Sequence, residues 1–252
     1  MSSIIIIPAR YRSTRFPGKV LYPLRGIPVI QHVYKNSKLS KLADDVIVAT
    51  DSEEIFNNVI SFGGKAIMTD RRHQSGTDRI AEVASSIDYD IIVNVQGDEP
   101  LIKPEMIDKV ILLLEDKKAD IGTLIKRITS LEEISNPNVV KVVTNNKGFA
   151  LYFSRAPIPY CRDEWKEDIK LDEIFDKYVF YKHIGIYSYR REILLSLSNM
   201  KQTILEKAEK LEQLRALENG FMIKTAEVFD EVYGIDTPQD IGRVERCLST
   251  SL

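Results

Sequence analysis

The chain is poor in the residues that build covalently linked or metal-bound scaffolds. Of its 252 residues, only two are cysteine, three are histidine and one is tryptophan. Cys161 and Cys247 lack metal-ligand spacing, and two cysteines cannot form a disulfide framework. We therefore expect neither a disulfide-stapled fold nor a Cys/His zinc site.

Long apolar runs are also missing. The first one is only Ile4–Ile7, and charge begins at Arg10, whereas a secretory signal needs a basic start and a longer apolar core. No window reaches the roughly 18 apolar residues of a membrane span. These absences predict a cytoplasmic protein with no membrane partner.

Neither sign of charge dominates. Lys and Arg number 35, Asp and Glu number 37, and the formal net charge is −2. A dedicated duplex-DNA binder usually carries a basic surplus, so we expect no nucleic-acid partner. The 44% of hydrophobic residues in a chain of this length predict one large globular domain over 1–252, with room for a subdomain.

The first half alternates between short apolar strands and helical segments. The run at 4–7 is β-branched and apolar on both faces, which is typical of a strand covered on both sides. This alternation predicts an α/β fold with a mostly parallel central sheet and a ligand site beyond the carboxyl ends of its strands. The expected elements are strands at 4–7, 45–50, 65–68 and 91–95 and helices at 29–39, 53–62, 78–86 and 104–115.

The second half has a different pattern. Strands separated by turn signals predict a smaller, partly antiparallel subdomain inserted at about 120–190. A single helix is predicted over 203–219, ending at Gly220. The expected strands are 120–128, 139–144, 152–154, 184–189 and 223–228.

A cluster of basic residues follows the first strand. It consists of Arg10, Arg12, Arg15 and Lys19. Guanidinium groups match phosphate oxygens in pairs and lysine adds a compact charge, so this loop predicts a pocket for a nucleoside triphosphate. Ser13 and Thr14 can add hydroxyl donors. The loop lacks the glycine of a P-loop and has no dinucleotide fingerprint.

Two aspartates stand at positions from which a side chain is expected to enter the ligand site at the carboxyl ends of the strands. Asp98 comes just after the apolar strand at 91–95, and Asp236 lies between Gly234 and a helix start at Thr237. Mg²⁺ prefers oxygen ligands and usually takes one or two carboxylates together with substrate phosphates. Asp98 and Asp236 are therefore the candidate metal ligands.

Seven motifs in fixed order carry a family resemblance across nearly the whole chain. The chain resembles the CMP-sugar-acid synthetases, and most closely the 3-deoxy-manno-octulosonate (Kdo) cytidylyltransferase family. The resemblance implies a Rossmann-like nucleotidyltransferase fold, the substrates CTP and Kdo, Mg²⁺ and a homodimer. The motifs are Pro8–Lys19, His73–Arg79, Val93–Pro100, Leu151–Pro159, His183–Tyr187, Leu211–Arg215 and Gly234–Pro238.

The same resemblance implies a reaction and roles for individual residues. The anomeric hydroxyl of the sugar acid would attack the α-phosphorus of CTP and release pyrophosphate, with no covalent enzyme intermediate. The residues expected to act in catalysis are Asp98, Asp236, Lys19 and Arg15. Those expected to bind CTP are Pro8, Ala9, Arg10, Ser13, Arg15, Lys19, Ser75, Gln96 and Asp98. Those expected to bind the sugar acid are Arg155, His183, Tyr187, Glu212 and Gln213.

Two alternatives stay open. The sugar acid can be the 8-amino analogue of Kdo or another acid such as sialic acid, although the motifs after Asp98 favour the Kdo type. A glycosyltransferase-type protein or a nucleotide-sugar binder is the alternative from another class. A glycosyltransferase of this architecture typically carries Asp-x-Asp after the central strand, whereas this chain has Gly97-Asp98-Glu99.

Overall fold

The computed structural model describes residues 1–13, 15–73, 75–165 and 171–250. Thr14, predicted to add a hydroxyl to the basic loop, and Gln74 of the second motif lie outside the described residues. The chain divides into two compact units. Unit 1 comprises Met1–Leu112, Ile186–Asn199 and Glu231–Leu252, and unit 2 comprises Leu113–Gly185 and Met200–Asp230.

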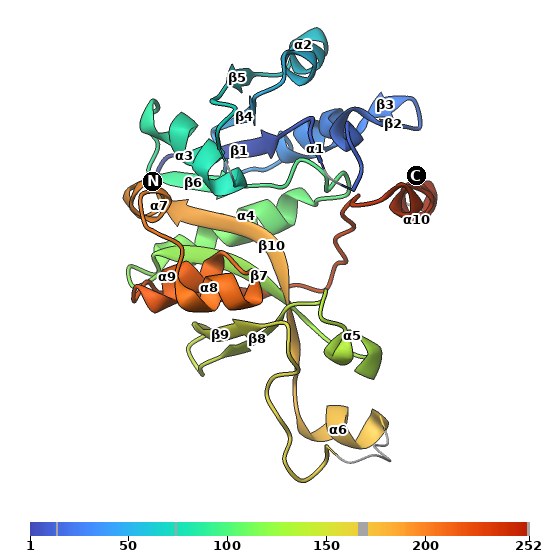
Figure 1. Ribbon diagram of the computed structural model, residues 1–252, viewed down its shortest axis with the longest axis vertical. Coiled ribbons are helices and arrows are strands. Elements are labelled where there is room, and N and C mark those ends of the chain that lie inside the picture. Colours follow the sequence, from blue (N-terminus) through green and yellow to red (C-terminus); the bar gives the residue numbers. More distant parts are fainter. Residues whose placement is uncertain (14, 74, 166–170, 251–252) are drawn as a thin grey trace. The chain divides into compact units, whose positions relative to one another are not determined.

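Unit 1 is built on a mostly parallel sheet, with β1 between β4 and β6 (Figure 1). In order across the sheet, its strands are β10 (Tyr181–Arg190, which enters unit 1 at Ile186), β6 (Ile91–Asn94), β1 (Ser3–Ala9), β4 (Asp45–Thr50) and β5 (Ala66–Met68). All pairs are parallel except that of β6 with β10, where Tyr187 lies opposite Asn94. Ile4 to Ile7 of β1 are fully buried, which confirms the prediction of a covered strand.

Helices alternate with these strands, so the predicted α/β alternation is confirmed. Asn36 of α1 donates to the Pro100 carbonyl in the loop before α4 (2.9 Å), and Arg191 of α7 donates to the Ala84 carbonyl of α3 (2.8 Å). The helices of unit 1 are α1 (Val29–Ser37), α2 (Glu53–Ser61), α3 (Gly76–Ser85), α4 (Pro104–Leu112), α7 (Arg191–Ser198) and α10 (Pro238–Thr250), with a 3₁₀ turn η1 (Lys19–Leu21) and a hairpin of β2 (Pro23–Leu24) and β3 (Ile27–Pro28).

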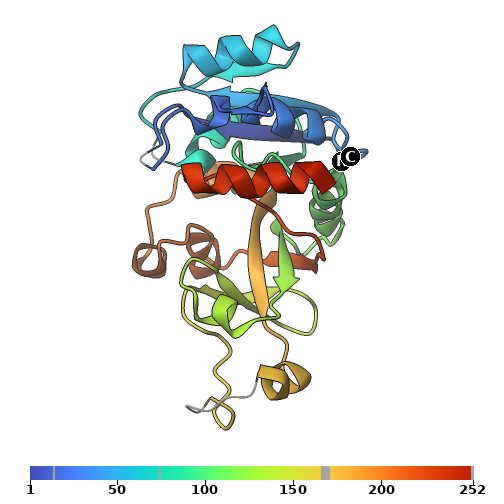
Figure 2. The ribbon, with the colours of Figure 1, turned by 90° about the vertical axis from the view of Figure 1, so that its right-hand side faces the viewer.

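Helix α10, the last helix of the chain, belongs to unit 1, although the residues immediately before Glu231 belong to unit 2. Figure 2 shows α10 in red, in side view. The Arg25 guanidinium, between β2 and β3, donates to the Glu245 carbonyl of α10 at 3.3 Å. The segment that leads into α10 therefore belongs with residues from the start of the chain, and it carries Asp236.

Unit 2 contains the antiparallel pairing that the sequence predicted and, in addition, one parallel pair of strands. β7 (Ile121–Arg127) pairs parallel with β11 (Ile223–Glu227), while β8 (Lys141–Thr144) pairs antiparallel with β9 (Ala150–Ser154) and with the start of β10. A separate apolar cluster forms around Cys161 and Phe180. The helices of this unit are η2 (Leu113–Glu115), α5 (Leu131–Ser135), α6 (Leu171–Lys177), α8 (Ile204–Glu209) and α9 (Gln213–Glu218).

The prediction of one helix over 203–219 is wrong, because the segment folds as α8 and α9. Lys210 takes a left-handed backbone conformation with φ of 54° and ends α8. Glu206 of α8 and Arg215 of α9, both nearly fully buried, form an ion pair between the two helices. Nη2 of Arg215 lies 2.6 Å from Oε1 of Glu206. None of the helices in the described ranges combines the length and the apolar character needed to cross a bilayer.

Candidate active site

A pocket in unit 1 gathers residues from the end of β1, from the segments after β1, β5 and β6, from the start of α3 and from the segment before α10. Its lining contains all nine residues predicted to bind CTP, and Asp236 joins them. This position agrees with the expectation that ligands bind beyond the carboxyl ends of parallel strands. The lining residues are Pro8, Ala9, Arg10, Ser13, Arg15, Lys19, Val20, His73, Ser75, Gly76, Arg79, Gln96, Gly97, Asp98 and Asp236.

The loop after β1 is folded back on itself by backbone hydrogen bonds. The Tyr11 carbonyl accepts from the amide of Ser13 at 3.1 Å and from that of Gly18 at 2.9 Å. Gly18 has φ of +72°, and a Cβ there would lie 3.4 Å from the Tyr11 ring. A residue without a side chain is favoured at such a turn. The turn places Lys19 at the start of η1, on the pocket wall.

The residue before Asp98 must also be small. A Cβ on Gly97 would lie 2.8 Å from the Pro8 carbonyl oxygen, closer than real Cβ contacts come. The ends of β1 and β6 therefore approach each other with backbone against backbone. This close approach carries Asp98 to the same pocket as the basic loop.

Backbone hydrogen bonds bring Asp236 to Asp98 from the far end of the sequence. The Ile235 amide donates to the Asp98 carbonyl at 2.9 Å. The Asp240 carboxylate, in the first turn of α10, accepts from the amides of Asp236 at 3.0 Å and Thr237 at 2.8 Å. These bonds fix the backbone on both sides of Asp236, so its carboxylate is presented by an ordered segment.

Lys19 bridges the two aspartates. Its Nζ contacts Oδ2 of Asp98 and lies 3.0 Å from Oδ1 of Asp236, and its side chain is only 12% exposed. Burial opposes the charge of the ammonium, but the charges of Asp98 and Asp236 and their hydrogen bonds outweigh burial and raise the pKa of Lys19. The ammonium therefore stays protonated at neutral pH and holds the two carboxylates together.

The remaining cations of the loop differ in placement. The Arg15 guanidinium pairs with Asp236 at 3.0 Å but is largely exposed, and Arg10 also lines the pocket. Arg12 does not line it, so three of the four predicted cations face this site. Arginines that remain accessible to solvent can turn toward a phosphate without losing a buried bond.

Glu99 does not line the pocket, but its carboxyl group is influenced by the charges of the acidic pair, which sequence reasoning missed. Its Oε2 is buried, with no hydrogen-bond partner among the described residues. Burial, reinforced by the charges of Asp98 and Asp236, raises the pKa of Glu99 to about 8. Its position directly after Asp98 was a visible signal, but burial of one carboxyl oxygen requires knowledge of the packing.

Ser75 and Gln96 already have partners within the chain. The Ser75 hydroxyl accepts from the Asp78 amide at 3.1 Å, and the Asp78 carboxylate accepts from the Ser75 amide, which together cap α3. The Gln96 amide donates to Asn94 at 3.4 Å. Both side chains nevertheless line the pocket, and His73 and Arg79, which had no predicted role, line it with them.

The residues expected to bind the sugar acid do not line this pocket. Tyr187, in unit 1, stacks on Tyr189 with ring centroids 5.7 Å apart. Arg155 is in unit 2, where its guanidinium donates to the carbonyls of Glu209 at 2.7 Å and Pro137 at 2.8 Å. Glu212 and Gln213 stand at the start of α9.

His183 is also in unit 2, on β10. Its Nε2 lies 3.0 Å from the hydroxyl of the fully buried Thr123, and its ring meets Phe153 edge-on. Burial lowers the pKa of His183 to about 3, so the imidazole is neutral at physiological pH.

Comparisons with known proteins agree with this geometry. The sequence matches the family described as "Cytidylyltransferase" over residues 4–227. It is 56% identical to the 3-deoxy-manno-octulosonate cytidylyltransferase of Geotalea daltonii over 97% of both chains. It is 54% identical to that of Geobacter metallireducens over 99% of this chain and 98% of the relative.

A solved structure extends the agreement to the fold. CMP:2-keto-3-deoxy-manno-octonic acid synthetase complexed with CTP is 41% identical, covers 100% of both chains and superposes with a TM-score of 0.92. The expected nucleotidyltransferase fold is thereby confirmed. By its sequence, its fold and the motifs that line its pocket, the chain belongs to the 3-deoxy-manno-octulosonate cytidylyltransferase family.

Proposed function

We propose that the protein transfers CMP from CTP to the anomeric hydroxyl of Kdo, releasing pyrophosphate and forming CMP-Kdo for lipopolysaccharide biosynthesis. The observation that carries the proposal is the pocket of unit 1, where Arg10, Arg15 and Lys19 meet Asp98 and Asp236. Relatives of the same name at 54–56% identity support it, and so does the similar structure solved with CTP.

The acidic pair fits a magnesium ion. Asp98 and Asp236 converge on one cationic atom, Lys19 Nζ, and this convergence supports the proposal of a cation site between the two carboxylates. The described residues contain no group of three or more metal-ligating side chains, so the protein would supply two carboxylates and the nucleotide the other ligands. When bound there, Mg²⁺ would neutralise phosphate charge and favour loss of the hydroxyl proton.

The protein's own part in the reaction is positioning and charge stabilisation. Phosphoryl transfer passes through a transition state in which negative charge spreads over oxygens, so fixed cations accelerate it. Arg10, Arg15 and Lys19 hold the triphosphate, and their charges stabilise the leaving pyrophosphate. A pre-shaped loop after β1 keeps these groups in place before the substrate arrives.

The sugar-acid side of the site rests on the family relationship. Arg155, His183, Tyr187, Glu212 and Gln213 stay proposed contacts of the sugar acid. Because the Arg155 guanidinium already donates to three carbonyls, its remaining N–H groups are the ones available to a carboxylate. The homodimer and the cytoplasmic location also stay predictions, and sedimentation analysis would test the first of them.

A substrate panel tests the proposal. The protein is incubated with CTP, Mg²⁺ and one sugar acid, and pyrophosphate release is measured. We expect release with Kdo and none with sialic acid, and the 8-amino analogue is the third arm. Absence of release with both Kdo and its 8-amino analogue would reject the proposal and favour a nucleotide-sugar binder.

The acidic pair is tested in the same assay. Asp98→Asn should lower turnover by about a hundredfold or more, because it removes a charge from the reacting centre. The matched control is Asp88→Asn, which alters an exposed aspartate between α3 and β6 outside the pocket. A normal rate for Asp98→Asn in Mg²⁺ would refute the metal assignment.

A further inference from the structure

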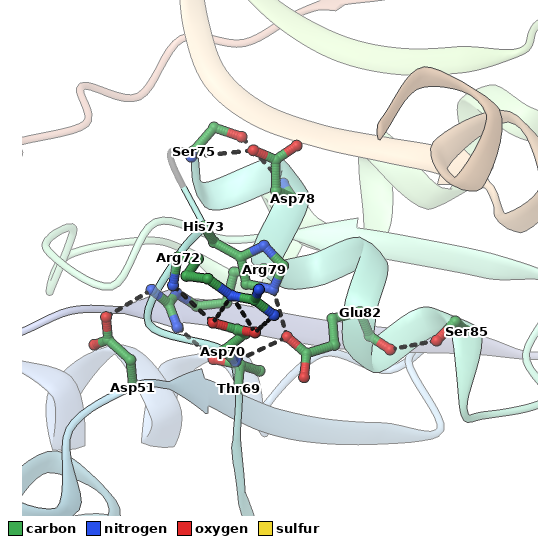
Figure 3. Close-up of polar contacts among 10 residues, drawn as sticks. All are labelled: Asp51, Thr69, Asp70, Arg72, His73, Ser75, Asp78, Arg79, Glu82 and Ser85. Carbon is green, nitrogen blue, oxygen red and sulfur yellow. Dashed lines mark hydrogen bonds and ion pairs between the residues drawn. The ribbon is translucent and has the colours of Figure 1, made fainter. Parts of the chain in front are cut away.

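Helix α3 holds the loop that precedes it through two side chains one turn apart, Arg79 and Glu82 (Figure 3). The Arg79 guanidinium is almost fully buried. It contacts the Thr69 hydroxyl and lies 3.0 Å from the Asp51 carboxylate. Asp51 and Thr69 directly follow β4 and β5, so Arg79 ties α3 to the carboxyl ends of two strands.

Glu82 holds the middle of the same loop. One of its oxygens, Oε2, accepts from the Asp70 amide at 2.9 Å and contacts Nε2 of His73. The ring is thus oriented by a carboxylate outside the pocket, while His73 itself lines the pocket. Figure 3 shows Glu82 reaching from α3 toward Asp70 and His73.

This contact determines which ring nitrogen can accept a hydrogen bond. A carboxylate only accepts, so in the neutral imidazole Nε2 carries the proton that it donates to Glu82. Nδ1 is then an acceptor, and no residue of the described ranges donates to it. In its neutral form, His73 therefore offers Nδ1 as a single acceptor from a residue that lines the pocket.

The position of His73 identifies which part of a nucleotide it would meet. The strand order places β6, which leads to Asp98, and β5, which leads to His73, on opposite sides of β1. The triphosphate belongs with Lys19 and Asp98. The loop after β5 then faces the other end of the nucleotide, which is the base.

We propose that His73, held by Glu82, selects cytosine over uracil by accepting a hydrogen bond from the exocyclic amine of the base. Uracil presents a carbonyl at that position, so two acceptors would face each other across the contact. His73 is then a specificity residue and Glu82 a positioning residue. The inference rests on the proposed function, because it requires a cytidine nucleotide in this pocket.

Binding measurements without any sugar acid test the inference separately from catalysis. The Kd values of CTP and UTP are measured by calorimetry for the intact protein and for each variant. The intact protein should bind CTP more tightly, and His73→Phe should reduce the ratio of the two Kd values by about tenfold or more. His73→Ala, checked for folding by circular dichroism, should do the same.

Variants of Glu82 and a loop control complete the test. Glu82→Ala should reduce the ratio, whereas Glu82→Gln should retain most of it, because the amide oxygen can still accept both bonds. Arg72→Ala is the matched control, since this exposed side chain pairs with Asp70 in the same loop and does not line the pocket.

Several results would overturn the inference. Equal affinity of the intact protein for CTP and UTP would do so, as would an unchanged ratio in both His73 variants. An unchanged ratio in Glu82→Ala would overturn the positioning role, and an equal drop in Arg72→Ala would assign the effect to general loop order. Selective CTP binding without pyrophosphate release from any sugar acid would reject the proposed function alone.

Discussion

Lys19 Nζ lies 3.0 Å from Oδ1 of Asp236, although 217 positions separate the two residues in the chain. The same ammonium contacts Asp98, so three elements from distant parts of the sequence meet at one charge. Two carboxylates at such proximity repel each other unless a cation lies between them. Lys19 is therefore both a candidate ligand of the triphosphate and the group that lets the acidic pair assemble.

Lys19→Met should distinguish the roles of the Lys19 charge from the contribution that its side chain makes to packing. It keeps the length of the side chain but removes the charge, so kcat/KM for CTP should fall by about a hundredfold or more. Steady-state kinetics with CTP and Kdo measures the effect. Lys38→Met is the control, because Lys38 is half exposed and pairs with Asp45. Comparable loss in both variants would contradict a specific role for Lys19.

Gly97→Ala tests the backbone approach that carries Asp98 into the pocket. The added methyl would lie 2.8 Å from the Pro8 carbonyl, so the ends of β1 and β6 must move apart. We expect a loss of about 1–3 kcal/mol in the free energy of unfolding, together with weaker CTP binding. Urea denaturation and calorimetry measure the two effects.

A second glycine provides the comparison for Gly97. Gly242 lies in α10, and a Cβ there would meet only the end of the flexible Arg246 side chain at 3.7 Å. Gly242→Ala should keep or raise stability, because alanine favours helix. Similar losses in the two variants would show that the contact with Pro8 is not the cause.

His183 should make the protein less stable in acid. Its pKa is about 3 in the folded state and about 6.5 when unfolded, so between these values the unfolded chain binds more protons. Stability is therefore complete above pH 6.5 and falls as the pH drops toward 3, by up to about 1.4 kcal/mol per pH unit. Urea denaturation at pH 7 and pH 5 measures the slope.

The comparison for His183 is His183→Gln, which keeps a polar group near Thr123 but cannot gain a proton. The variant should lose less stability between pH 7 and pH 5 than the original protein. Parallel curves for the two proteins would mean that His183 is accessible to protons in the folded state.

Much of the pocket proposed to bind CTP could be predicted from the sequence for simple physical reasons. A run of four β-branched isoleucines is typical of a covered strand, and the chain order of parallel strands places the residues after Ile7 and Val95 at one edge. Charge clustering then pointed to the basic loop. Each of these inferences depends on local pattern and on a general rule of sheet topology.

Other features depend on contacts that no local pattern records. The break at Lys210 is favoured by the buried pair of Glu206 and Arg215, and both residues have good helix propensity in isolation. The Glu99 side chain, whose Oε2 is buried, lies close to Gly234, more than a hundred positions away: a Cβ on that glycine would lie 4.0 Å from Glu99 Cγ. The bonds of Arg155 to the carbonyls of Glu209 and Pro137 likewise appear only once unit 2 has folded.

The bridge made by Lys19 also affects how a nucleotide approaches. The pocket wall carries four cationic side chains, Lys19 and three arginines, against the two carboxylates that Lys19 bridges, so positive charge is in excess before any ligand arrives. A positively charged pocket attracts the negatively charged triphosphate over several ångströms, and dissolved salt shortens the range of this attraction. The speed of nucleotide capture should therefore fall as ionic strength rises, even though the net charge of the whole chain is −2.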